Sequence, residues 1–159
     1  MTPTLYTIIM ISKEPTQSDI DSALQTLYAA GLPIRSAVTG PSHVARSSTN
    51  VNPFSKPIQD LATQVGWGTI WSRPGLSRQQ RSLINVAMLT ALGKSQELGV
   101  HVKGAVRNGC SVLEVREALL HASVYGGLPS GLEGFRVAER VLEELVGREE
   151  LDRAVKAKL

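Results

Sequence analysis

The sequence contains a single cysteine, Cys110, only three histidines and only 4% aromatic residues. One thiol cannot form an internal disulfide or a Cys-x-x-Cys redox pair, so we expect a reducing, cytoplasmic location. The histidines and the cysteine have no zinc-ligand spacing, and no phosphate-binding loop or activated serine is recognisable. We therefore expect no metal and no cofactor, and a chemistry carried by ordinary side chains.

The chain also lacks any apolar run that approaches the roughly 20 residues of a membrane helix. The apolar segment 5–11 is short, has no basic residue before it and no small-residue cleavage site after it, so we expect no signal peptide and no membrane partner. We interpret this segment as an edge strand or as an arm that packs on a neighbouring subunit. A hydrophobic content of 42% over 159 residues is typical of one globular domain with a real core.

Acidic residues are scarce in the middle of the chain, where residues 31–110 contain nine basic residues against two acidic ones. Aromatic residues are too few for stacking on bases, and no nucleic-acid reader motif is present, so we expect no nucleic-acid partner. This excess of positive charge belongs to a solvated surface, to pairs with the acidic C-terminal helix, or to a site for a small anionic ligand. Scattered arginines suit such a ligand because a guanidinium binds a carboxylate through two hydrogen bonds.

Between residues 77 and 147, capping signals and apolar stripes predict four helices joined by short turns. The start and stop signals, in chain order, are the capping box Ser77–Gln80, Gly93, Ser95 as the next cap, Asn108–Gly109, the capping box Ser111–Glu114, and Pro129. This spacing is typical of a helical bundle.

The first half of the chain is less regular. A possible cap at Ser18-x-x-Asp21 predicts a helix that runs to Gly31, and a second helix is expected from about Phe54 to Val65. The prediction is an all-α, single-domain helical bundle with an irregular N-terminal arm over 1–20, a helical domain over 21–148 and a C-terminal tail over 149–159.

Glu97 and His101 lie four residues apart in one of the predicted helices, so their side chains would share a face and could share a proton. A histidine with an ordinary pKa near 6.5, oriented by a carboxylate, is a suitable acid or base at neutral pH. Alternatively, Glu97 complements the dipole of the first helical turn, and His101 is a packed or surface histidine. Trp67 and Trp71 have the same spacing and are interpreted as core or pocket wall.

Six short motifs occur in a recognisable order. They are Gly40-Pro-Ser-His43-Val-Ala-Arg46-Ser47, Trp67-Gly-Thr-Ile-Trp71-Ser-Arg73-Pro-Gly75-Leu76, Arg81-Ser-Leu, Glu97-x-x-x-His101, Asn108-Gly109 and Tyr125-Gly-Gly-Leu-Pro129. From about Gly31 to Val146 the chain resembles the carboxymuconolactone decarboxylase family, in its 4-carboxymuconolactone decarboxylase branch. The resemblance implies an alkylhydroperoxidase-D-like helical subunit that assembles into trimers or hexamers. It also implies cofactor-free decarboxylation of 4-carboxymuconolactone, which gives 3-oxoadipate enol-lactone and CO2, or of a closely related lactone acid.

The same fold serves thiol-dependent peroxidases, which carry a Cys-x-x-Cys pair just before the histidine. Here the stretch from Lys94 to His101 contains no cysteine, so we do not expect peroxidase chemistry. Two further alternatives stay open. One is a cofactor-free isomerase or cyclase acting on a related lactone or polyketide acid, and the other is a non-catalytic helical module that binds small acids.

The resemblance assigns possible roles to individual side chains. His101 becomes a proton donor or oxyanion partner, and Glu97 orients it or relays the proton. The residues expected to bind the anionic lactone are His43, Arg46, Arg73, Arg81 and Tyr125. Each of them has an ordinary alternative, namely solvated or intersubunit charge for the arginines, a loop histidine for His43 and a hydrogen-bonded core tyrosine for Tyr125.

Overall fold

The computed structural model describes residues 14–156, which form eight α-helices and one π-helical segment, with no strand. The elements are α1 (Gln17–Thr39), α2 (Pro41–Thr49), α3 (Lys56–Leu61), η1 (Ala62–Ile70), α4 (Arg78–Ala91), α5 (Ser95–Arg107), α6 (Val112–Gly126), α7 (Leu128–Val146) and α8 (Arg148–Lys156). The predicted all-α bundle is confirmed. The apolar segment 5–11 lies outside the described residues. None of the described helices is both long enough and apolar enough to span a membrane.

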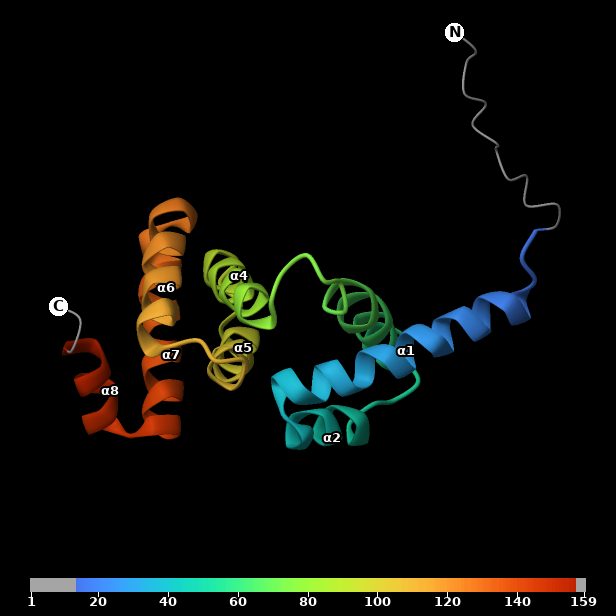
Figure 1. Ribbon diagram of the computed structural model, residues 1–159, viewed down its shortest axis with the longest axis horizontal. Helices are drawn as coiled ribbons and strands as arrows, with labels where there is room; N and C mark the ends of the chain where they lie inside the picture. Colours follow the sequence, from blue (N-terminus) through green and yellow to red (C-terminus); the bar gives the residue numbers. More distant parts are fainter. Residues whose placement is uncertain (1–13, 157–159) are drawn as a thin grey trace, which may run out of the picture.

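The helices α4 and α5 occupy the centre of the molecule (Figure 1). On one side lie α6, α7 and α8, and on the other lie α1 and α2 with the π-helical segment (Figure 1). The central pair packs on both neighbours, since α4 contacts α6 and α7 while α5 contacts α7 and α1. A side chain on α5 can therefore face either of two different groups of helices.

The hydrophobic core lies between α4, α5, α6 and α7. On α5 the buried side chains are Leu98, Val102 and Ala105, which recur at the spacing of one helical face. The opposite faces of the neighbouring helices supply the rest of the core, including Val86, Val115, Leu119, Val137 and Val141.

The predicted helix signals over residues 77–147 are confirmed with one exception. Both capping boxes form, with Ser77 accepting from the backbone of Gln80 and Ser111 from that of Glu114. The exception is Ser95, which is the first helical residue rather than the cap. Lys94 occupies the cap position and provides no side-chain hydrogen bond.

The predicted start and end of the first helix were wrong. The capping box is formed by Thr16 and Asp19 rather than by Ser18, and the helix continues through Gly31 and Pro33 to Thr39. Gly31 does not end the helix because it faces the backbone of η1, so tertiary contact holds this segment in the helical conformation. Residues 17–20, which were assigned to the N-terminal arm, belong to α1.

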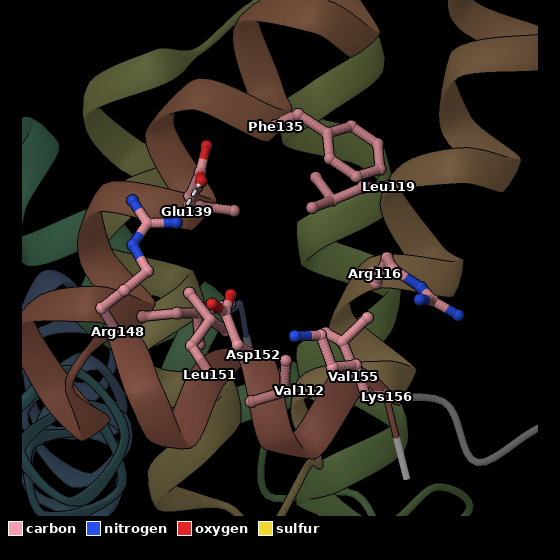
Figure 2. Close-up of a pocket in the computed structure, with 12 residues that line it drawn as sticks. Val112, Arg116, Leu119, Phe135, Glu139, Arg148, Leu151, Asp152, Val155 and Lys156 are labelled. Carbon is pink, nitrogen blue, oxygen red and sulfur yellow. Dashed lines mark hydrogen bonds and ion pairs between the residues drawn. The ribbon is translucent and has the colours of Figure 1, made fainter. Parts of the chain in front are cut away.

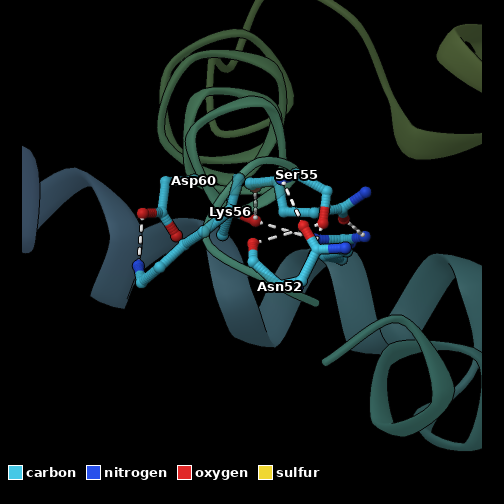
Figure 3. A network of polar contacts seen from close by, with 7 residues as sticks. Asn52, Ser55, Lys56 and Asp60 are labelled. Atoms are coloured by element: carbon cyan, nitrogen blue, oxygen red, sulfur yellow. Dashed lines mark hydrogen bonds and ion pairs between the residues drawn. The ribbon is translucent and has the colours of Figure 1, made fainter. Parts of the chain in front are cut away.

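The helix predicted over Phe54–Val65 begins later and changes type. The Oδ1 atom of Asn52 accepts hydrogen bonds from the backbone of Phe54 and Ser55, both at 3.0 Å, and this side-chain turn delays the helix to Lys56 (Figure 3). An ion pair between Lys56 and Asp60 follows on α3 (Figure 3). From Ala62 the chain continues as a π-helix to Ile70, well beyond the expected end.

Residues 148–156, which the sequence assigned mostly to a tail, form α8. Leu151 is buried against the bundle, and α6, α7 and α8 together surround an apolar cavity of about 320 Å³ (Figure 2). Phe135 and Leu119 point into this cavity, while an ion pair of 2.7 Å between Arg148 and Glu139 lies at its edge (Figure 2). None of the predicted site residues lines it.

The backbones of α1 and η1 approach each other closely at two glycines. A Cβ atom on Gly31 would lie 2.2 Å from the carbonyl oxygen of Thr63, and one on Gly68 would lie 2.2 Å from that of Leu27. Such distances leave no room for any side chain at either position.

We expect Gly31→Ala to lower the free energy of unfolding by about 3 kcal/mol, because the methyl group forces α1 and η1 apart. Urea denaturation followed by circular dichroism measures this change. Gly66→Ala is the matched control on η1, where a Cβ meets nothing within 4 Å. That variant should be as stable as the parent or about 0.5–1 kcal/mol more stable. Equal stability of the two variants would contradict the packing argument.

Candidate functional site

His101 lies in the middle of α5, and its half-buried side chain faces the π-helical segment. Its ring is nearly parallel to that of Trp67, at a centroid distance of 6.1 Å and an angle of 6°. The ring of Trp71 lies 6.5 Å away, and the two indoles contact each other at 4.8 Å. The interpretation of both tryptophans as core or pocket wall therefore agrees with the structure, since they form an aromatic wall beside His101.

Asn85 on α4 is the polar partner of His101. Its side-chain nitrogen lies 3.3 Å from the Nδ1 atom of the imidazole. An amide nitrogen only donates hydrogen bonds, so Nδ1 accepts and the proton of the neutral ring resides on Nε2. In this tautomer His101 presents an Nε2–H donor.

The pKa of His101 is lowered from its ordinary value, first by burial and then by the neighbouring His43. The negative charge of Glu97 opposes this shift. Burial disfavours the charged imidazolium because the aromatic surroundings solvate it poorly. His101 is therefore neutral at pH about 7 and acts as a hydrogen-bond donor in that state.

Glu97 lies one turn before His101, as predicted, but no hydrogen bond joins the two side chains in the described part of the chain. Glu97 is exposed in the first turn of α5, where an acid complements the helix dipole, and it acts on His101 through charge. The expected direct sharing of a proton is not present in this arrangement. The imidazole turns instead toward α4 and η1.

Arg81 lies one turn before Asn85 on α4, so both side chains are on the face of that helix directed toward His101. One terminal nitrogen of Arg81 donates to the backbone carbonyl of Arg73 at 3.0 Å. The Nε atom of Arg81 is buried and has no hydrogen-bond partner, and it is the one such side-chain atom within residues 14–156. Two of the predicted arginines are thus brought together, with one donor left for a ligand.

His43 and Arg46 line a separate cleft of about 590 Å³ between α2, α5 and α7. The pKa of His43 is lowered by burial and by the positive charges of Arg35, Arg46 and Arg107. The charge of His43 in turn acts on His101, which makes His43 the electrostatic link between this cleft and the aromatic wall.

Tyr125, the remaining predicted residue, is 81% exposed near the end of α6. Its described contact is with the ring of His121, at a centroid distance of 4.8 Å, rather than with His101. The ordinary alternative of a buried core tyrosine does not apply either. Within one subunit the structure does not bring Tyr125 to the other predicted residues.

Cys110 is buried, and its thiol lies 3.5 Å from the backbone carbonyl oxygen of Gln79. Burial, helped by the negative charge of Glu114, raises the pKa of this thiol to about 11. The thiol therefore stays protonated at neutral pH and is a poor nucleophile. No group of three His, Cys, Asp or Glu side chains within residues 14–156 is placed to hold a metal ion.

Sequence reasoning did not identify Asn85, nor the cleft residues Arg107 and Arg140. Asn85 follows Arg81 by four residues, a spacing that could have placed it on the same face of the predicted helix. Arg107 contributed only to the charge count, and nothing in the local sequence marks Arg140 as different from the other charged residues of α7.

Comparisons with known proteins identify a family and similar chains. The carboxymuconolactone decarboxylase family matches residues 57–140. The chain is 40% identical to a nitrosuccinic acid decarboxylase of Metarhizium robertsii over 133 residues, which cover 84% of this chain and 93% of that protein. It is 42% identical to a 4-carboxymuconolactone decarboxylase of Acinetobacter baylyi over 118 residues, which cover 74% of this chain and 88% of that protein.

The contact with Asn85 predicts the protonation state of His101. In ¹H–¹⁵N spectra at pH about 7, His101 should be neutral with its proton on Nε2, and it should titrate below the ordinary histidine value of about 6.5. Burial lowers the pKa because it disfavours the charged imidazolium, so His101 stays neutral at a lower pH than an exposed histidine does. Asn85→Leu should abolish the tautomer preference. An Nδ1–H tautomer in the parent protein would contradict the assigned hydrogen bond.

Proposed function

Because this chain belongs to the carboxymuconolactone decarboxylase family and is a carboxy-lyase, we propose that its substrate is 4-carboxymuconolactone or a closely related lactone acid. The observation that carries this proposal is that α5 holds a neutral Nε2–H donor on His101, while α4, which packs on α5, holds a guanidinium nitrogen without a partner on Arg81. The Nε2–H of His101 suits a developing oxyanion, and the guanidinium of Arg81 suits a carboxylate.

The reaction needs an acceptor for the electron pair that CO2 leaves behind. In the lactone acid, the bond between the ring carbon and its carboxylate breaks, and CO2 departs. The electron pair moves through the ring double bond into the lactone carbonyl, giving a dienolate. A proton then adds to the ring carbon next to that carbonyl, which produces the enol-lactone. The substrate itself accepts the electrons, so the protein has to position charge and deliver one proton.

We assign His101 the role of oxyanion donor. Its neutral Nε2–H can hydrogen-bond the lactone oxygen as negative charge develops there, and a neutral donor loses no proton at that stage. The indoles of Trp67 and Trp71 offer flat walls for a planar ring. Their apolar surface also disfavours a localised carboxylate charge, which promotes loss of CO2.

Three further predicted residues have roles in this proposal. Arg81, with its Nε free and its terminal nitrogen on the carbonyl of Arg73, binds a substrate carboxylate. Glu97, which is exposed and electrostatically coupled to His101, relays the proton from solvent to carbon. Burial keeps His101 neutral, and positive charge on His43, which forms only below the ordinary histidine pKa, opposes protonation of His101 further.

The relative from Metarhizium robertsii supports a second candidate, nitrosuccinate, because it aligns with 84% of this chain. Nitrosuccinate is also a dianion with a built-in electron acceptor. Loss of the carboxylate beside the nitro group would place the electrons on the nitro oxygens as a nitronate, which needs the same oxyanion donor and the same carboxylate site.

We expect the purified protein to release CO2 from 4-carboxymuconolactone with formation of the enol-lactone, followed by NMR. Nitrosuccinate is assayed in parallel, and turnover of it alone would favour the second candidate. His101→Gln and Glu97→Gln should each lower kcat by about 10²–10⁴-fold. His121→Gln, an exposed histidine on α6, is the control and should retain full activity. Proton exchange without CO2 release would favour the isomerase alternative, and inactivity on both acids would overturn the proposal.

We further propose that the subunit assembles into a homo-oligomer, as trimers or hexamers. Support comes from large apolar side chains that are exposed on α4, α6 and α7, where soluble monomers rarely gather them. They are Ile84, Met88, Leu92, Leu120, Val124, Leu128 and Leu132. The ends of α4 and α6 are adjacent, because a Cβ on Gly126 would lie 2.6 Å from that of Ala91.

Val124→Glu should shift the protein toward monomer in size-exclusion chromatography with light scattering, because Val124 is 75% exposed in the subunit and a buried carboxylate would destabilise an interface. Val124→Thr preserves the shape of the side chain and serves as the control, which should keep the parent mass. A parent protein that elutes as a monomer at micromolar concentration would contradict this assembly.

A further inference from the structure

We propose that the cleft between α2, α5 and α7 is a second anion-binding site, distinct from the His101 side of α5, for a small molecule with two or more carboxylates. The cleft has a volume of about 590 Å³. Four basic side chains line it, namely Arg46 of α2, Lys103 and Arg107 of α5, and Arg140 of α7. This inference does not rest on the proposed decarboxylation, because it concerns equilibrium binding.

The cations of the cleft are largely without carboxylate partners. The one acid in its lining, Glu144, forms an ion pair of 3.0 Å with Lys103. Arg46, Arg107 and Arg140 form no ion pair with any carboxylate in residues 14–156. Three guanidiniums thus face one cleft with their charge uncompensated by the protein.

Arg140 has no ion-pair partner in the described residues, unlike the neighbouring arginines. The other arginines on α6, α7 and α8 each form an ion pair with a nearby glutamate, and they are Arg116, Arg136, Arg148 and Arg153. Glutamates are therefore abundant in this part of the chain, yet none is placed on Arg140. A carboxylate ligand would supply the missing partner.

Arg107 is held in position before any ligand arrives. Its guanidinium donates to the backbone carbonyls of Val38 at 3.3 Å and Thr39 at 3.0 Å, at the end of α1. It also lies against Gly40, where a Cβ atom would be only 3.0 Å from Nη2. Neutral carbonyl partners fix the side chain and leave its charge intact, so little rotamer entropy remains to be lost on binding.

The start of α2 adds donors to the same cleft. Gly40, with a φ of 96°, turns the chain so that Pro41, Ser42 and His43 line the cleft at the first turn of this helix. No side chain caps the helix there, and its N-terminus favours negative charge. The pKa of His43 is lowered first by burial and then by the positive charges of Arg35, Arg46 and Arg107.

The cleft and the aromatic wall use different faces of α5. The α5 residues that line the cleft are Ser95, Gln96, Gly99, Val100, Lys103 and Arg107. His101 and Glu97 are not among them, and the ring of His101 turns toward Trp67 and Asn85. An anion bound in the cleft would therefore not contact the ring of His101.

The test is calorimetric titration of the full chain with acetate, succinate and citrate at low ionic strength. We expect affinity to rise from the mono- to the tricarboxylate and to fall with added salt. Arg46→Gln and Arg140→Gln should each weaken citrate binding about tenfold, since each removes a charge-assisted hydrogen bond. Arg136→Gln is the matched control on α7, because Arg136 is already paired with Glu133. It should bind citrate like the parent.

Three outcomes would overturn the inference. The first is no binding of citrate, and the second is equal binding by the parent and the two cleft variants. The third is a loss of citrate binding in His101→Gln, which would place the anion beside the aromatic wall instead. Light scattering on the same variants tests a further outcome that would also overturn the inference. A changed mass in Arg46→Gln or Arg140→Gln would mean that a second copy of the chain, and not a small anion, occupies the cleft.

Discussion

The close approach of the α1 and η1 backbones fixes the position of the aromatic wall, on which the environment of His101 depends. Gly31 and Gly68 permit this contact because neither has a Cβ atom. Arg35 reinforces it through hydrogen bonds from α1 to Gln59 at 2.8 Å and Thr63 at 2.9 Å. With this side of η1 held against α1, Trp67 and Trp71 are directed to α5, where they surround the imidazole.

The structure separates neutral from charged donors. His101 lies where burial opposes protonation, so it offers a hydrogen bond without a charge. Arginine side chains remain protonated in proteins and can supply positive charge even when partly buried. Arg81 lies on α4 one turn before Asn85, which bonds His101, and other guanidiniums line the cleft on a different face of α5. In the proposed reaction, the charged arginines attract the anionic substrate and the neutral His101 stabilises the developing oxyanion.

The helix boundaries that the sequence predicted correctly depend on local hydrogen bonds. The capping boxes at Ser77 and Ser111 involve residues three apart, so the sequence alone contains both partners. Some errors are local, such as the missed cap at Thr16 and the turn at Asn52, but two others occur where distant segments meet. The helix α1 passes through Gly31 because η1 packs on it, and η1 adopts π-helical geometry with its Gly68 against α1. Neither effect can be deduced from the residues of a single segment.

The sequence by itself determined the all-α class, most helix starts, the spacing of Glu97 and His101, and the excess of arginine around them. These properties depend on composition and on neighbours within about one helical turn. Only the tertiary structure decided that His101 bonds Asn85 rather than Glu97, and that Arg46, Arg107 and Arg140 line one cleft. The physical reason is that such contacts depend on how each helix is rotated about its axis, which the packing of the whole bundle fixes.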